Sequence, residues 1–214
     1  AINDAPIATQ GLSATTNEDQ SVVITLSGSD IDGDNLTFSL DSDATNGSIT
    51  VDGSLATYLP YADFNGSDSF TFIVSDGELT NQASVTVVVN PVNDAPVLAA
   101  ITDVSFEEGS LGNINLLATD ADNDNLTYSI AGGTNITGIL NENEVTFSAI
   151  ENFNGSESFT ISVSDGEYTD SQSITVTVEA INDAPIATQG LSATTNEDQS
   201  VVIILTGTDV DGDA

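Results

Sequence analysis

Apolar and polar residues alternate along most of the chain with a period of two, the spacing expected of β-strands that have one buried face. No helical pattern of useful length occurs. The first 90 residues predict seven short strands: one before Asn17, one near Leu55, and others at residues 22–26, 36–40, 49–51, 70–74 and 85–89. Between two of these strands, Asp52-Gly53 predicts a tight hairpin turn.

The same series of strands recurs once in full, because similar apolar segments lie at residues 114–116, 126–130, 145–147, 159–163 and 174–178. The tetrapeptide Asn-Asp-Ala-Pro stands at residues 3–6, 93–96 and 182–185, with spacings of 90 and 89 residues. Residues 180–203 are identical to residues 1–24. We therefore expect linkers at 1–6, 93–96 and 182–185, two repeats at 7–92 and 97–181, and the first strands of an incomplete third repeat at 186–214. The chain is expected to be a window cut from a longer array.

Seven short strands in ~90 residues indicate a Greek-key β-sandwich of the immunoglobulin type. The predicted fold class is all-β, with tandem seven-stranded sandwiches joined end to end. Phe64 and Phe153 lie in matching Phe-Asn-Gly turns, and we expect both rings to pack at one end of their core.

Composition then narrows the chemistry. The chain has 34 acidic residues and no Lys, Arg, His or Cys, for a formal charge of −34, yet 39% of its residues are apolar. A catalytic triad, a thiol nucleophile and a cysteine zinc site are therefore excluded, and nucleic-acid binding is disfavoured because nothing can neutralise phosphates. No apolar run reaches 18 residues, so we expect no membrane insertion in this segment. The remaining ligand atoms are oxygens, which suit hard cations such as calcium.

The acidic residues recur at fixed places in the repeat. Three sets can be matched between the repeats. The first is the acidic pair Glu18-Asp19, with Glu107-Glu108 and Glu197-Asp198, and the second is Asp76 with Asp165. The third is the pattern Asp-x-Asp-x-Asp, which begins at Asp30, Asp120 and Asp209. Two carboxylates ~4 Å apart repel by about 4 kcal/mol at an effective dielectric of 20. Recurrence at strand ends favours metal binding, above all for Asp120 and Asp122. A solvated acidic surface is the open alternative for all of these acids. It is the favoured interpretation for five others: Asp41, Asp43, Glu78, Glu142 and Asp170.

An EF-hand loop starting at Asp30 is rejected. Its sixth position is Asn35 instead of the turn-forming glycine, and the twelfth position of the second copy is Ala131, which cannot ligate a cation.

Three segments together resemble a cadherin repeat: Asp120-Ala121-Asp122 with Asn125 before a strand, Ser164-Asp165-Gly166, and Val92-Asn93-Asp94-Ala95-Pro96. The chain is most similar to bacterial cadherin-like, VCBS-type repeats of large surface adhesins. The resemblance covers both full repeats and the partial third one.

The resemblance implies calcium between consecutive repeats. The ligands that it implies at the first full joint are Glu18, Asp63, Asn93, Asp94, Asp120, Asp122, Asn125 and Asp165. Those at the preceding joint are Asn3, Asp4, Asp30, Asp32 and Asp76, and those at the following joint are Glu107 or Glu108, Asn182, Asp183, Asp209 and Asp211. The linker is one residue shorter than in animal cadherins, and the Asp-Arg-Glu motif is missing, with Asp63 and Asn152 only in matching positions. We therefore expect fewer or weaker ions, with affinities of about 10⁻⁴–10⁻³ M.

The function expected from these patterns is a calcium-rigidified spacer or adhesive stalk, at the cell surface or outside the cell and not an enzyme. Its partners would be neighbouring repeats of the same chain, with glycans or other cell-surface molecules as further candidates. A subunit of a self-assembling extracellular fibre is a close alternative. A carbohydrate-binding module is the alternative of another class, although Trp is absent and the four tyrosines, Tyr58, Tyr61, Tyr128 and Tyr168, are scattered.

Overall fold

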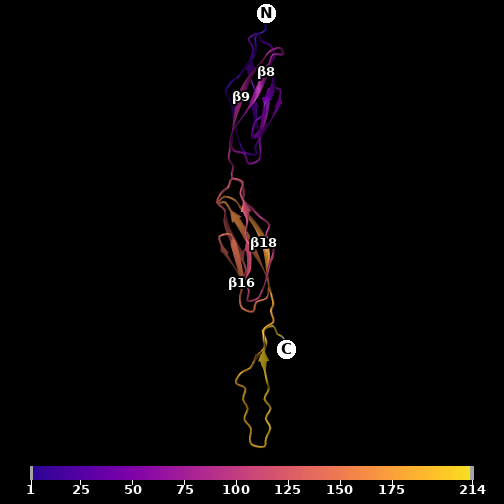
Figure 1. Ribbon diagram of the computed structural model, residues 1–214, viewed down its shortest axis with the longest axis vertical. Helices are drawn as coiled ribbons and strands as arrows, with labels where there is room; N and C mark the ends of the chain where they lie inside the picture. The colour runs from indigo at the N-terminus through magenta and orange to yellow at the C-terminus, as the bar shows by residue number, and fades with distance from the viewer. Residues whose placement is uncertain (1, 213–214) are drawn as a thin grey trace. The chain divides into compact units, whose positions relative to one another are not determined.

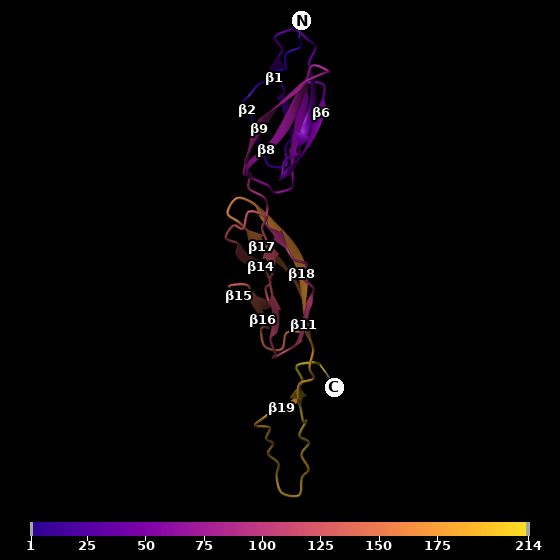
Figure 2. The ribbon, with the colours of Figure 1, turned by 45° about the horizontal axis from the view of Figure 1, so that its top comes forward.

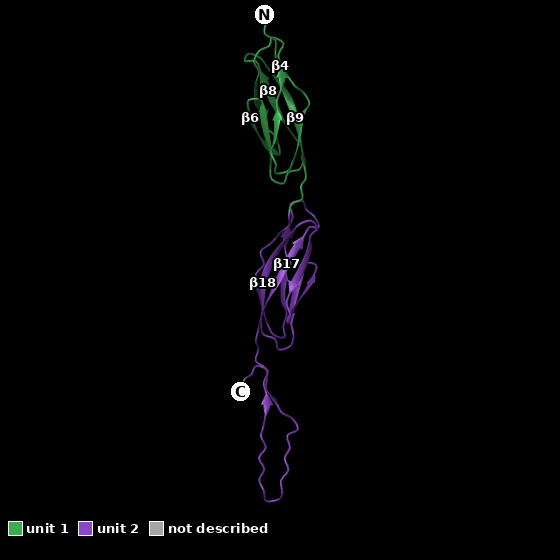
Figure 3. Cartoon of the chain, turned by 180° about the vertical axis from the view of Figure 1, so that it is seen from behind, with its two compact units in different colours: residues 1–94 green, residues 95–214 purple. Residues whose placement is uncertain are grey.

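The computed structural model describes residues 2–212, and within them every regular element is a β-strand. The chain divides into two compact units, residues 1–94 and 95–214 (Figure 3). The predicted all-β class is confirmed. None of the described residues forms a helix that could cross a membrane.

Unit 1 is a β-sandwich of seven main strands. The four-stranded sheet has the order β2-β9-β8-β5, built from Leu12–Asn17, Thr80–Asn90, Gly66–Ser75 and Thr37–Ser42. The three-stranded sheet has the order β3-β7-β6, built from Val22–Thr25, Leu55–Pro60 and Gly47–Asp52. A two-stranded ladder of β1 (Ile7–Ala8) and β4 (Gly28–Ser29) completes the unit, whose strands run side by side in Figure 1.

Unit 2 repeats this topology between residues 97 and 179 (Figure 2). Its four-stranded sheet is β11-β18-β17-β14, from Val104–Glu107, Thr169–Glu179, Gly155–Ser164 and Thr127–Gly132. Its three-stranded sheet is β12-β16-β15, from Gly112–Asn115, Glu144–Ala149 and Ile136–Asn141, and its short ladder joins β10 (Val97–Leu98) to β13 (Ala118–Thr119).

The alternation of the sequence places one face of each strand in the core. Phe70, Phe72 and Val74 on β8 are fully buried, and every second residue of β9 from Ala83 to Val89 is buried with them. As predicted, Phe64 and Phe153 pack against the cores of their units. The predicted hairpin is also confirmed, because Asp52 pairs with Leu55 across a two-residue loop in which Gly53 has a φ of 56°.

The third repeat forms much less structure than the sequence predicts. Only the ladder of β19 (Ile186–Ala187) and β20 (Gly207–Thr208) forms, and the residues between them are exposed. In unit 1 the corresponding strands β2 and β3 pair with β9 and β7, which have no counterparts within residues 187–212. Strands β1 and β4 pair only with each other, so their counterparts β19 and β20 can form alone.

Candidate metal centres at the ends of each unit

The Asp30 loop of unit 1 is organised by one carboxylate oxygen. Asp30 Oδ1 accepts hydrogen bonds from the backbone N–H groups of Asp32 at 2.8 Å, Gly33 at 3.1 Å and Asp34 at 3.3 Å. Its other oxygen, Oδ2, is buried and has no hydrogen-bond partner within residues 2–212. Oxygens of Asp30, Asp32 and Asp34 lie within 4.8 Å of one another. The loop thus gathers three carboxylates and leaves one buried acceptor oxygen without a hydrogen bond in residues 2–212.

The first linker is tied to this end of unit 1 through acids. The backbone N–H of Asp4 donates to Asp32 Oδ2 at 2.8 Å, and Asn3 Nδ2 donates to Asp76 Oδ2 at 3.0 Å. Asp76 Oδ1 accepts the N–H groups of Leu79 and Glu78, both at 2.7 Å, and these hydrogen bonds lower the pKa of Asp76. Five residues predicted for one joint therefore lie together: Asn3, Asp4, Asp30, Asp32 and Asp76.

The opposite end of unit 1 carries a buried glutamate. Glu18 is 4% exposed, and its Oε1 accepts the backbone N–H of Val92. Its Oε2 is buried without a hydrogen-bond partner among the described residues. One oxygen of Glu18 and one of Asp94 lie within 4.8 Å of each other. The side-chain amide of the neighbouring Asn93 donates from Nδ2 to the backbone carbonyl oxygen of Asp94 at 3.3 Å.

Unit 2 begins with a copy of the Asp30 loop. Asp120 Oδ1 accepts the N–H groups of Asp122 at 3.0 Å and Asp124 at 3.2 Å, while Asp120 Oδ2 is buried without a partner in the described part of the chain. Asp165 Oδ1 accepts two backbone N–H groups, at 2.6 and 2.7 Å, as Asp76 does in unit 1. Asn125 is exposed at the end of the same loop, separated from β14 by Leu126.

The end of unit 2 brings three carboxylates together. Oxygens of Glu108, Asp183 and Asp211 lie within 4.8 Å of one another. Glu108 Oε1 accepts the N–H of Ile181 at 2.5 Å, and the N–H of Asp183 donates to Asp211 Oδ2 at 2.6 Å. Burial raises the pKa of Asp183, and the negative charges of Asp211 and Glu108 raise it further. Asp209 Oδ1 accepts the N–H of Asp211 at 3.0 Å.

Glu108, and not Glu107, is the structural counterpart of Glu18. The N–H of Glu18 donates to Asn90 O at 3.0 Å, and that of Glu108 donates to Glu179 O at 2.9 Å. Glu107 lies on β11, paired with Glu179, and its side chain is exposed outside the cluster. The other predicted residue here, Asn182, donates from Nδ2 to the Asp183 carbonyl oxygen at 3.1 Å.

Two further carboxylates have a different role, which the sequence analysis missed. Asp68 is 6% exposed and accepts the N–H groups of Thr45 and Asn46 and the hydroxyl of Tyr58. In unit 2, Glu157 accepts the N–H groups of the matching loop, residues 134–136. Both acids fall at inward-facing positions of their strands, in step with the buried aromatic residues. An acid at an inward-facing position of a strand is the sequence signal that could have identified both residues as anchors of the neighbouring loop.

The ligand atoms gathered at the ends of each unit fit a hard cation. They consist of oxygen atoms alone, and three buried carboxylate oxygens, on Glu18, Asp30 and Asp120, lack a hydrogen-bond donor in residues 2–212. A buried anionic oxygen is costly unless it is paired or bound to a metal. The sequence contains no Lys, Arg or His to pair with it. Carboxylate and carbonyl oxygens are the ligands that calcium prefers.

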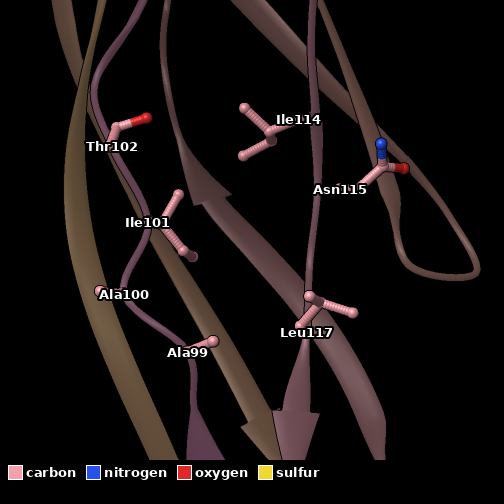
Figure 4. A pocket seen from close by; sticks show the side chains of 7 residues that line it. All are labelled: Ala99, Ala100, Ile101, Thr102, Ile114, Asn115 and Leu117. Carbon is pink, nitrogen blue, oxygen red and sulfur yellow. The ribbon is translucent and has the colours of Figure 1, made fainter.

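An apolar hollow in unit 2 does not have the lining of a sugar site. Its volume is about 260 Å³, and Figure 4 shows the side chains around it. Sugars bind on aromatic faces, and none of the lining residues is aromatic: Ala99, Ala100, Ile101, Thr102, Ile114, Asn115 and Leu117.

Part of the chain is similar to a chitinase. It is 34% identical over 132 residues to chitinase A of Pseudoalteromonas piscicida, which is 59% of this chain and 16% of the chitinase. An endo-fucoidan hydrolase from glycoside hydrolase family 107 aligns with 24% identity over 83% of this chain and 29% of its own, with a TM-score of 0.38. The chain therefore spans less than a third of the length of either protein.

Human protocadherin-24 domains EC1-2 share the fold. The alignment covers 84% of this chain and all of that structure, with 19% identity and a TM-score of 0.58. A second crystal form of the same domains gives a TM-score of 0.51. The model of the bacterial Ig domain matches twice, at residues 3–88 and 93–177. These matches cover most of the chain, which therefore belongs to the bacterial Ig domain family and carries two tandem copies of it.

Proposed function

We propose that this chain is part of an extracellular spacer or adhesive stalk in which calcium stiffens the joints between repeats. Bacterial Ig-like domains are typically extracellular or surface domains and are generally not enzymes. Tandem repeats with short linkers suit a spacer, because each repeat adds a fixed length. The parent protein would be a longer surface or secreted protein, of the kind that includes VCBS-type adhesins.

The single observation that carries this proposal is the cluster at the end of unit 2. Glu108 comes from the sandwich, Asp183 from the linker and Asp211 from the segment that follows. Carboxylate oxygens this close together repel one another, and this repulsion opposes the ordered linker unless a cation compensates it. A divalent ion reverses the sign of the interaction, so that the same three residues hold the linker in place.

The residues that would hold calcium follow from the geometry. In unit 1 they are Glu18 with Asp94 at one end and Asp30 with Asp32 at the other; in unit 2 they are Asp120 with Asp122, and Glu108 with Asp183 and Asp211. When bound, calcium supplies the positive charge that the chain lacks. The protein contributes the ordered loops that present these oxygens, through the backbone hydrogen bonds of Asp30 and Asp120.

Small-angle X-ray scattering of the whole chain tests the proposal. In 2 mM calcium we expect a larger maximum dimension and a narrower distance distribution than in chelator, because ordered linkers hold successive repeats apart. Sodium chloride of equal ionic strength is the control for general charge screening. An identical scattering curve in calcium and in chelator would count against calcium-dependent stiffening.

The chitinase relative favours a second candidate, a carbohydrate-binding module of a polysaccharide-degrading enzyme. Sedimentation with insoluble chitin separates the two. A stalk or plain spacer leaves the chain in the supernatant, whereas retention that soluble chitin oligosaccharides reverse would support a carbohydrate-binding module.

A further inference from the structure

The apolar hollow of unit 2 lies beside an open strand edge. In the sheet order β12-β16-β15, strand β12 is an edge strand, and among the described residues it pairs only with β16. Leu116, directly after β12, faces β16, because its N–H donates to Asn143 O at 2.7 Å. Successive residues of a strand direct their backbone groups to opposite edges, so those of Asn113 and Asn115 face the open edge. An edge of this kind can pair with an added strand.

The segment at residues 99–103 leaves this edge uncovered. Its first residue still pairs there, since the N–H of Ala99 donates to Leu117 O at 2.8 Å. Beyond it, Gln172 of β18 donates from Nε2 to Ala99 O at 3.2 Å and accepts the N–H of Ile101 on Oε1 at 3.0 Å. The segment therefore turns towards β18, and the hollow remains between it and the β12 side.

The hollow has aliphatic side chains on both sides. Figure 4 shows the side chains of Ile101 and Ile114 directed toward the space between their two segments. Leu117 also lines the hollow and is 67% exposed. The volume of about 260 Å³ is below the roughly 300–1,000 Å³ of small-molecule sites, so the hollow suits a few side chains of a peptide. In β-strand addition, such pockets take alternate side chains of the added strand.

Unit 1 has a polar contact at the same place. The matching residues lie 90 positions earlier, with Thr9 in place of Ala99 and Ser27 in place of Leu117. Ser27 Oγ donates to Thr9 Oγ1 at 2.9 Å. A glycine, Gly11, stands where unit 2 has the isoleucine of the hollow. The apolar lining therefore belongs to unit 2 and is not required by the fold that both units share.

The residues around the hollow carry negative charge. Asp103 follows the lining residue Thr102, and Glu144 pairs with the lining residue Asn115; both acids are exposed. The sequence contains no Lys or Arg that could offset them. Such a surface attracts a basic partner and repels an acidic one. A segment that enters this hollow is therefore expected to be basic as well as apolar.

We propose that the open edge of β12 and the hollow bind an extended segment of another protein in which apolar and basic residues alternate. The segment adds as a strand beside β12, places apolar side chains in the hollow and presents basic side chains to the surrounding acids. This inference goes beyond the proposed function, because it gives the chain a protein partner and does not depend on calcium.

Fluorescence anisotropy of a labelled decapeptide of alternating lysine and valine, titrated with the whole chain, tests this interaction. We expect binding at least about 10-fold tighter than that of a lysine-serine decapeptide of equal charge, because only the former has apolar side chains to bury. The double variant Ala99→Thr with Leu117→Ser gives unit 2 the polar residues of unit 1 and should abolish the difference. Ile139→Thr removes an exposed aliphatic side chain from β15, the other edge strand of the same sheet, and as the matched control should bind like the wild type. Circular dichroism will verify that both variants fold.

Two N-methylated peptides test strand addition itself. The backbone N–H groups of alternate residues point to opposite edges of an added strand, so only one edge faces β12. Methylation of one set of amides, at the valines or at the lysines, should abolish binding, whereas methylation of the other set should leave it intact. Equal binding of both methylated peptides would contradict strand addition.

The other outcomes are equally distinct. Equal affinities for the lysine-valine and lysine-serine peptides would reduce the interaction to charge attraction, and undiminished binding by the Ala99→Thr and Leu117→Ser variant would place it outside the hollow. A glutamate-valine peptide that binds as tightly would overturn the basic partner. If sedimentation velocity shows a wild-type dimer that this variant loses, the occupant is a second copy of the chain and the proposal is wrong. None of these results bears on calcium binding, which scattering tests separately.

Discussion

Glu18→Gln gives the sharpest prediction, because its effect on stability should depend on calcium. Glutamine has nearly the same shape, and its amide oxygen can still accept the N–H of Val92, so the packing and this hydrogen bond are retained. What disappears is the buried negative charge. We therefore expect the variant to be more stable than the wild type in chelator, and calcium to narrow the difference.

The size of the effect follows from the separation of two carboxylates. Oxygens of Glu18 and Asp94 lie within 4.8 Å, where two unit charges repel by about 3.5 kcal/mol at an effective dielectric of 20. Because Asp94 is only half-buried, we expect the gain in unfolding free energy to be about 2 kcal/mol in chelator. Calcium at ten times its dissociation constant should stabilise the wild type by about 1.4 kcal/mol per site, and the variant by less than half of that.

Differential scanning calorimetry in chelator and in 2 mM calcium measures both quantities. The change should be confined to the transition of unit 1, and Asp52→Asn, an exposed acid in the hairpin of the same unit, is the matched control. Suppose instead that Glu18→Gln lowers stability equally in chelator and in calcium. The carboxylate would then be a structural hydrogen-bond acceptor, and the interpretation of this cluster as a cation site would be refuted.

Three other predictions concern the rest of the fold. Asp68→Ala should lower the unfolding free energy of unit 1 by about 3 kcal/mol in urea denaturation, because it leaves the buried Tyr58 hydroxyl and two loop N–H groups without an acceptor; a loss below about 1 kcal/mol would contradict the anchoring role. Glu142→Gly should raise the stability of unit 2 by about 0.5 kcal/mol, because Glu142 has a φ of 55° at the hairpin position that glycine occupies in unit 1, and Gly53→Glu should have the opposite sign. Backbone N–H groups lower the pKa of Glu157 from 4.5 to about 2, so this carboxylate stabilises the folded state above pH 4.5 and the contribution is lost as the pH falls towards 2. Acid titration monitored by circular dichroism should be shallower in this range for Glu157→Gln, and an unchanged profile would contradict the assigned pKa.

The strands were predictable because alternation of apolar residues needs only local information. Phe70, Phe72 and Val74 mark the buried face of β8 in the sequence, and the structure buries all three. The third repeat illustrates the limit of this approach: in unit 1 the matching strands β2 and β3 pair with β9 and β7, and residues 187–212 contain no counterparts of those two strands. Alternation therefore predicts which face is buried, whereas strand formation also depends on distant partners.

Pairing of the acids could be predicted only in part. Asp30 with Asp32 and Asp120 with Asp122 follow from local spacing, because an aspartate side chain readily accepts the N–H two residues later. The match of Glu18 to Glu108 was available from spacing, because Glu18 lies 15 residues after Asn3 (18 − 3) and Glu108 lies 15 residues after Asn93 (108 − 93), but the shared acidity of Glu107 hid it. The backbone hydrogen bonds, and the N–H of Ile181 that donates to Glu108 Oε1, confirm Glu108 as the counterpart.

Crystallography of the chain grown in 5 mM calcium tests the central claim most directly. The account predicts calcium density within about 2.3–2.6 Å of carboxylate oxygens of Glu18 and Asp94, and again at Glu108, Asp183 and Asp211. Anomalous scattering would identify the ion. If those carboxylates point into water with no ion between them, a solvated acidic surface accounts for the sequence, and calcium has no part in the joints.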